Sequence, residues 1–282
     1  MTTTPSSRRH FLTAASAALA TASLWPGRVA ADEAAGENGD FDFLAVNDLH
    51  FTDPKKCPPW FNEVFAAMKA SAPKAEFVLV GGDLTSECTA PEFGMVRDML
   101  GAFGLPVHVT LGNHDVTEKG ERALFEKFFP GQRNYIVEHR GWHIVSADSV
   151  QDRGWEGTKI PEATVQWLGE ALARIDRRKP LVVSTHFPLG AGMIRRPKNA
   201  DAFLDCFRKH NVRAIFNGHW HGFGQMMFKD AIVSTGRCCS RYRSNHDGSK
   251  KKGWYVCEAR QGTITRRFVP VPEALIEQSE WH

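Results

Sequence analysis

The fold of this chain is organised around PVHVTLGNHD, residues Pro106 to Asp115. Its first six residues are mostly apolar or β-branched and predict a buried strand. Gly112 then allows a sharp turn, and an amide, an imidazole and a carboxylate follow directly. In an α/β sheet, ligands bind just beyond the carboxyl ends of strands. Asn, His and Asp after Gly also make an ordinary turn, so a functional interpretation needs matching groups elsewhere.

Four other predicted strands end in side chains of the same kinds. They are Phe41–Asn47, Phe77–Val80, Leu181–Thr185 and Val212–Phe216. Asp48 and His50 are two residues apart, so in an extended backbone their side chains point the same way. The same spacing separates His219 from His221. Together with the third strand, these strand ends supply the candidate metal ligands Asp48, His50, Asp83, Asn113, His186, His219 and His221.

Each of these motifs alone could be a capped turn or a packed core histidine. Five strand ends that all carry such groups indicate a metal site instead. Oxygen and imidazole ligands without thiolate suit Fe, Mn, Zn or Co ions.

The remaining patterns predict mixed sheets flanked by helices, an α/β fold with α+β additions. Helices are expected at Trp60–Ala72, Pro91–Phe103, Thr117–Phe129, Pro161–Ile175 and Asp201–His210. Further short strands, expected as antiparallel additions, are Asn134–Glu138, Trp142–Ala147, Gly224–Phe228, Ala231–Thr235, Trp254–Ala259 and Thr263–Val269. Two basic segments, 188–198 and 237–253, have no regular pattern and are expected to be loops.

The N-terminus is typical of an export signal. Arg8 and Arg9 precede a mild Ala- and Leu-containing run, and no acidic residue comes before Asp32, as in a twin-arginine signal peptide. A membrane anchor or a disordered tail are the alternatives, but the run is short and rich in Ala, Ser and Thr, which disfavours a stable membrane span. We therefore expect a signal peptide at 1–31, a linker at 32–40, one domain at 41–270 and a tail at 271–282, with a periplasmic or extracellular mature protein.

Charge and cysteine content limit the possible partners. The chain has 35 Lys and Arg and 32 Asp and Glu residues. Because Arg8, Arg9 and Arg28 lie in the expected signal, the mature chain is close to neutral, which gives no support for nucleic-acid binding. The six cysteines, Cys57, Cys88, Cys206, Cys238, Cys239 and Cys257, match no zinc template, and their pairing is open.

The order of the motifs resembles the calcineurin-like metallophosphoesterases. That family has the series D-x-H, G-D, G-N-H-[D/E], a single His, and G-H-x-H, and all five blocks occur here in order from Asp48 to His221. The resemblance implies a four-layer αββα sandwich, with two mixed β-sheets between helices. It also implies two metal ions, one held by Asp48, His50, Asp83 and His221 and the other by Asp83, Asn113, His186 and His219.

The resemblance further assigns roles in hydrolysis. It implies that His114 protonates the leaving group or stabilises the transition state, with Asp115 orienting it. A carboxylate such as Asp83 can join two cations, and two ions about 3.5–4 Å apart can share an attacking hydroxide. The alternative for His114 is a further metal ligand or a turn residue.

The details of the motifs favour one branch of this family. Ser86 stands where purple acid phosphatases have a tyrosine ligand, so a tyrosinate-coloured iron site is not expected. The chain is more similar to bacterial cyclic-nucleotide and glycerophosphodiester phosphodiesterases, although Thr185 replaces the first histidine of their usual pair. We expect a hydrolase of small phosphate esters that favours diesters; a phosphomonoesterase and a non-catalytic metal- or phosphate-binding protein are the alternatives.

Overall fold

The computed structural model of the chain describes residues 39–278, which form two β-sheets and six α-helices. The first sheet has the order β11-β10-β1-β2-β3 and the second β4-β5-β6-β7-β9-β8. In the first sheet the strands are β1 (Phe41–Val46), β2 (Ala75–Val80), β3 (Val107–Val109), β10 (Gly253–Arg260) and β11 (Thr263–Pro270). In the second they are β4 (Tyr135–His139), β5 (Trp142–Ser146), β6 (Pro180–Ser184), β7 (Asn211–Asn217), β8 (Gly224–Phe228) and β9 (Ala231–Thr235).

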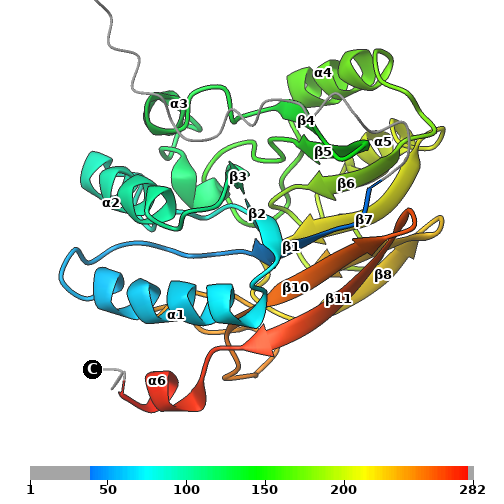
Figure 1. The fold of residues 1–282 in the computed structure, drawn as a ribbon. Coiled ribbons are helices and arrows are strands. Elements are labelled where there is room, and N and C mark those ends of the chain that lie inside the picture. Colours follow the sequence, from blue (N-terminus) through cyan, green and yellow to red (C-terminus); the bar gives the residue numbers. More distant parts are fainter. Residues whose placement is uncertain (1–38, 279–282) are drawn as a thin grey trace, which may run out of the picture.

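Both sheets are mixed, as the sequence predicts. Strands β1, β2 and β3 are parallel, and β10 and β11 join them antiparallel. Strands β5, β6, β7 and β9 are parallel, while β4 and β8 pair antiparallel at the two edges. The carboxyl ends of the parallel strands therefore collect the loops that carry the polar motifs (Figure 1).

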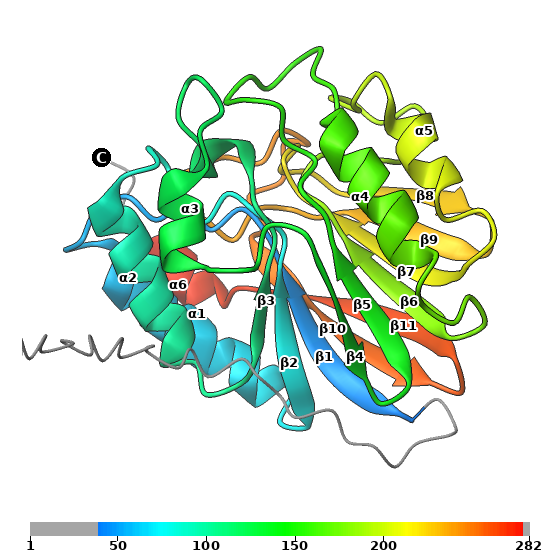
Figure 2. The same ribbon diagram turned by 90° about the horizontal axis from the view of Figure 1, so that it is seen from above.

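The two sheets pack face to face between helices, so the predicted four-layer sandwich is confirmed. The helices are α1 (Cys57–Ser71), α2 (Ala90–Gly101), α3 (Ala123–Phe128), α4 (Glu162–Leu172), α5 (Ala200–Asp205) and α6 (Glu273–Gln278). Helices α1, α2 and α3 lie on the outer side of the first sheet, and α4 and α5 on that of the second (Figure 2).

Alternation along β1 shows how one strand serves two cores. Phe43 and Ala45 face the second sheet, where they pack in a cluster with Trp142 and Phe216. Leu44 and Val46 point the opposite way and pack under the helices. This period of two is that of a strand buried on both faces.

Two expectations for helices need correction. The helix expected over Thr117–Phe129 is present only as α3, because Gly120 has a φ of +76° and closes a turn before it. The helix expected over Asp201–His210 ends at Asp205 as α5. The described part of the C-terminal segment 271–282 contains α6, and Leu275 and Ile276 pack against the core.

Among residues 39–278, no helix combines the length and apolar composition needed to cross a membrane. All six cysteines are free thiols. The expected signal peptide lies outside the described residues.

Candidate metal centre

The seven predicted ligands come together at the carboxyl ends of the parallel strands. Their side chains are all buried. Two groups of metal-ligating side chains form there, Asp48, His50, Asp83 and His221 in one, and Asp83, His186 and His219 in the other. Within each group the ligand atoms lie within 4.8 Å of one another. The shared Asp83 makes the two groups neighbours.

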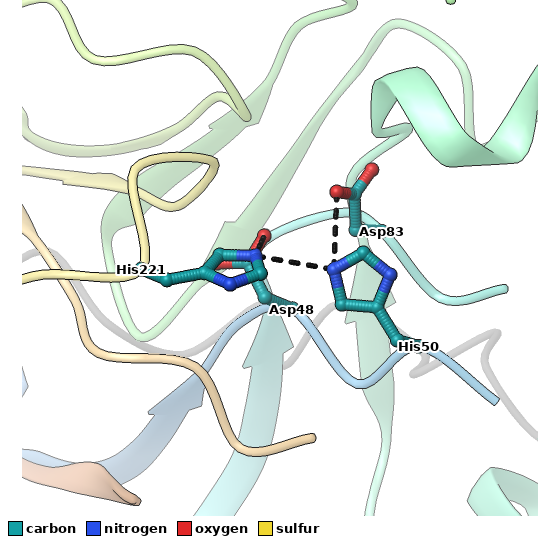
Figure 3. A group of neighbouring side chains, drawn as sticks. All are labelled: Asp48, His50, Asp83 and His221. Atoms are coloured by element: carbon teal, nitrogen blue, oxygen red, sulfur yellow. Dashed lines mark hydrogen bonds and ion pairs between the residues drawn. The ribbon is translucent and has the colours of Figure 1, made fainter. Parts of the chain in front are cut away.

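In the first group, imidazole nitrogens and carboxylate oxygens converge on one point (Figure 3). His50 Nε2 lies 3.4 Å from Asp83 Oδ2 and 3.1 Å from His221 Nε2. His221 Nε2 is in turn 3.4 Å from Asp48 Oδ1. β1 supplies two of these residues through the loop after it, and the other two follow β2 and β7.

In the second group, the amide oxygen of Asn113 takes the place of another carboxylate. Asn113 Oδ1 lies 3.0 Å from His186 Nε2 and 2.9 Å from His219 Nδ1. His186 Nε2 is also 3.2 Å from Asp83 Oδ1. The amide nitrogen of Asn113 donates to the carbonyl of Arg153 at 3.1 Å, which fixes the amide with its oxygen toward the histidines.

Backbone carbonyls orient three of the histidine rings. His186 Nδ1 donates to Gly81 O at 3.0 Å, and His221 Nδ1 donates to Ser244 O at 3.1 Å. His219 Nε2 donates to Trp155 O at 3.1 Å. Each ring therefore turns its other nitrogen, with a free lone pair, toward the ligand group, as metal-bound histidines do.

This donor set fits a metal ion. The lone pairs of His186 Nε2, His219 Nδ1 and Asn113 Oδ1 face one another at about hydrogen-bond distance. Three acceptors cannot satisfy one another, so the group needs a proton or a metal cation between them, and a metal cation would engage all three. Imidazole and oxygen ligands with no thiolate suit a first-row divalent ion.

The buried carboxylates of the two ligand groups also need a positive counter-charge. Burial disfavours the His186 imidazolium, but the Asp83 and Asp48 carboxylates outweigh burial and raise its pKa to about 9. Burial likewise raises the pKa of Asp48, but His221 and His186 outweigh it and lower that pKa to about 2. Two buried carboxylates thus remain ionised, and a bound cation would replace the imidazolium proton as their counter-charge.

The backbone at the ligands is not extended as expected. Five of the ligands have a left-handed backbone, with φ of 54° at Asp48, 48° at His50, 49° at Asp83, 67° at His219 and 46° at His221. Asp48 and His50 therefore join the same ligand group because the chain coils after the strand, and alternation along a strand is not the cause. His219 and His221, expected to point the same way, join different groups. For residues other than glycine this conformation costs about 1–2 kcal/mol each, and such strain is concentrated at functional sites.

His114 and Asp115 lie beside the ligands, within a single 3₁₀ turn, Asn113–Asp115. His114 Nδ1 donates to Ser86 O at 2.8 Å. This contact leaves Nε2 for the cavity that His114 lines. The backbone N–H of His114 donates to Asp83 Oδ1 at 2.8 Å.

Asp115 does not contact the His114 ring in the described structure. Its carboxylate accepts hydrogen bonds from the backbone N–H groups of Leu84, Thr85 and Gly112 at 2.8–3.1 Å. Thr85 Oγ1 also donates to Asp115 Oδ1, at 3.0 Å. The carboxylate thus ties the loop after β2 to the loop after β3, and the expected direct orientation of His114 is replaced by support of the backbone around it.

Sequence reasoning missed the segment around Arg153 and Trp155, in the connection from β5 to α4. Two of its backbone carbonyls hold Asn113 and His219, as described above. The Arg153 guanidinium donates to Ser86 O at 2.7 Å and lies 3.4 Å from His114 Nδ1. Contacts made by carbonyl groups are independent of residue type, so no sequence signal could have revealed them.

A cavity of about 420 Å³ opens onto the centre. It is lined by ligand residues, His114 and groups from the two predicted basic loops. Those loops contribute Arg195 from the segment after β6, and Tyr242, Arg243, Ser244 and His246 from the segment after β9. Its volume suits a small organic ligand.

Comparison with known proteins identifies relatives named as phosphoesterases. The family model of calcineurin-like phosphoesterases matches residues 41–223, which include every ligand. A protein of Synechococcus named "Probable cyclic nucleotide phosphodiesterase" is 26% identical over 202 residues, covering 67% of this chain and 77% of that protein. A protein of Arcobacter nitrofigilis named "Probable glycerophosphodiester phosphodiesterase" is 25% identical over 176 residues, covering 58% and 63% respectively.

Solved structures share the fold at low sequence identity. The purple acid phosphatase PPD1 from yellow lupin seeds superimposes with a TM-score of 0.61 and 14% identity, covering 83% of this chain and 52% of that one.

Proposed function

The chain belongs to the calcineurin-like phosphoesterase family, and from this premise we propose that it is a dinuclear metallohydrolase that cleaves phosphodiesters of small molecules. The observation that carries the proposal is the pair of buried ligand groups that share Asp83. A single carboxylate with two oxygens can belong to two coordination spheres, and Asp83 Oδ1 and Oδ2 face different histidines.

The first ion would be held by Asp48, His50, Asp83 and His221, and the second by Asp83, Asn113, His186 and His219. Two bound ions would polarise the phosphoryl oxygens and supply a nucleophile at neutral pH. Fe, Mn, Zn or Co are the ions that this donor set favours. Neutral Asn113 in place of a third carboxylate keeps net positive charge at the centre, which attracts an anionic ester.

His114 would donate the proton to the leaving group. It lines the cavity, and its ring lies 4.8 Å from that of His50, measured between centroids. Ser86 O fixes Nδ1, so Nε2 is the nitrogen that can carry the proton into the cavity. Asp115 contributes by holding the loop on which His114 stands.

A preference for diesters is supported by the relatives named as cyclic-nucleotide and glycerophosphodiester phosphodiesterases. The decisive experiment compares turnover of bis-(p-nitrophenyl) phosphate and mono-(p-nitrophenyl) phosphate by metal-loaded protein, together with metal analysis. We expect two metal ions per chain and faster turnover of the diester. Absence of turnover on both esters with Fe, Mn, Zn and Co would reject the proposal; faster monoester turnover would identify a phosphomonoesterase.

Export by the twin-arginine route is a separate proposal that rests on the sequence. It is supported by Arg8 and Arg9 before an apolar run. Cell fractionation of the full chain and of the double variant Arg8→Lys and Arg9→Lys tests it. Retention of the variant in the cytoplasm is expected, and equal distribution of both proteins would contradict the proposal.

A further inference from the structure

Each of the two predicted basic loops has one arginine paired with a carboxylate and another that lines the cavity. Arg196 pairs with Asp201 at 2.6 Å, and Arg237 pairs with Asp247 at 2.8 Å. Arg195 and Arg243 both line the cavity. Among residues 39–278, neither of these two guanidinium groups has a hydrogen-bond acceptor or an acidic partner within contact distance. The fold thus pairs Arg196 and Arg237 with carboxylates and leaves Arg195 and Arg243 as unpaired charges in the cavity lining of the described structure.

Arg195 is held in place by an aromatic ring and not by an anion. Its guanidinium lies 4.0 Å from the centre of the Trp155 ring, a distance typical of a cation–π contact. Trp155 is itself anchored, because its carbonyl accepts from the metal-ligand histidine His219. A cation–π contact uses the face of the guanidinium and leaves its N–H groups available to an anion.

Charge balance in the cavity indicates what those donors bind. Asp83 is the only acidic side chain among the cavity-lining residues of the described structure, and it belongs to the metal centre. A phosphodiester group carries one negative charge, which the net positive metal centre would balance. Arg195 and Arg243 therefore add two positive charges that a simple diester does not use.

We infer that the substrate is a phosphoester carrying a second anionic group, a phosphate or a carboxylate, which Arg195 and Arg243 bind away from the scissile bond. This inference rests on the proposed function and narrows its substrate class. Guanidinium groups suit both anions because they donate two parallel hydrogen bonds. The free arginines then act in specificity, while hydrolysis itself depends on the metal ligands and His114.

The test uses three p-nitrophenyl diesters that differ only in the second alcohol, which is ethanol, 3-hydroxypropionate or 2-hydroxyethyl phosphate. Metal-loaded protein should show a kcat/KM at least about tenfold higher for the two charged esters than for the ethyl ester. Arg195→Gln and Arg243→Gln should each remove most of this advantage, so that kcat/KM falls far more for the two charged esters than for the ethyl ester. The relative rates of the two charged esters distinguish phosphate from carboxylate.

Arg196→Gln is the matched control, because it removes a charge from the same loop outside the cavity lining. Calorimetric titration with ethylphosphonate and 2-carboxyethylphosphonate gives a readout independent of turnover, and the second ligand should bind at least about tenfold more tightly. Equal kcat/KM for all three esters, or equal effects of all three Arg→Gln changes, would overturn the inference. If no ester is hydrolysed, the proposed function fails, and calorimetry alone decides whether the arginines select a second anion.

Discussion

At the scale of single residues, Asn113 is the most informative candidate ligand. Its amide oxygen faces both His186 Nε2 and His219 Nδ1, and its amide nitrogen bonds only to a carbonyl. Asn113→Ala should therefore lower kcat by about 100-fold or more and reduce metal content toward one ion per chain, while the fold persists. Parallel measurement of kcat and of metal stoichiometry by elemental analysis checks this. Unchanged metal content in Asn113→Ala would remove Asn113 from the ligand set.

His114 can be tested separately from metal binding. If it protonates the leaving group, His114→Ala should lower the rate about 10²–10⁴-fold for a diester with a poorly activated alcohol. An ester of p-nitrophenol needs little protonation, so its loss should be smaller. Stopped assays on both ester types, with metal content measured alongside, provide the comparison. Equal losses on the two esters would assign His114 to transition-state stabilisation instead.

His108, on β3, gives a pH-dependent contribution to stability far from the metal ligands. Burial, aided by His139, lowers its pKa to about 4 from 6.5. A lowered pKa in the folded state means that stability is full above pH 6.5 and falls as pH drops toward 4. The shift corresponds to about 3 kcal/mol. Urea unfolding at several pH values should show this loss in the wild type and a smaller one in His108→Gln; the same pH dependence in both proteins would contradict it.

At the scale of elements, helix α2 depends on its N-terminal cap. Thr89 Oγ1 accepts from the backbone N–H of Glu92 at 3.4 Å, and the Glu92 carboxylate accepts from the backbone N–H of Thr89 at 3.1 Å. Thr89→Ala should lower the free energy of unfolding by about 1 kcal/mol. Thr89→Ser keeps the hydroxyl and is the control. Chemical denaturation of the two variants measures the difference, and equal destabilisation by both would argue against the cap.

Comparing predicted with observed elements shows which features of the fold could be predicted from the sequence. Strands such as β8 and β9 were predicted to the residue, because short apolar runs bounded by turn residues have few alternatives. The candidate ligands could be selected from the sequence because each follows such a strand. The length of α3 was missed because the left-handed turn at Gly120 competes with helix propensity. The left-handed backbone at Asp48 and His219 was also missed, since it depends on packing between loops distant in sequence.

At the scale of the whole molecule, the candidate metal centre joins the two sheets. Asp48, Asp83 and Asn113 follow strands of the first sheet, and His186 and His219 follow strands of the second. Ions bound between them would bind only the folded state. Metal at 1,000 times its Kd should therefore raise the free energy of unfolding by about 4 kcal/mol.

Thermal unfolding of metal-loaded and chelator-treated protein measures this contribution. The chelated protein should unfold at a clearly lower temperature, and adding back metal should restore the higher value. The Asn113→Ala variant, which should lose one ion, is expected to lie between the two. An unfolding temperature that is the same with and without chelator would show that a bound metal ion does not stabilise the contact between the sheets.

The left-handed backbone at five candidate ligand residues has an evolutionary consequence. Five L-amino acids, among them His219 and His221, hold a conformation that glycine adopts without steric cost. Their replacement is opposed by selection for the ligand atoms and by backbone contacts such as that from the His114 N–H to Asp83 Oδ1. In a lineage that no longer needed hydrolysis, glycine would spread at these positions early and the sheets would stay intact. A descendant could then keep this sandwich with glycines at its former ligand positions, and those glycines would record the lost activity.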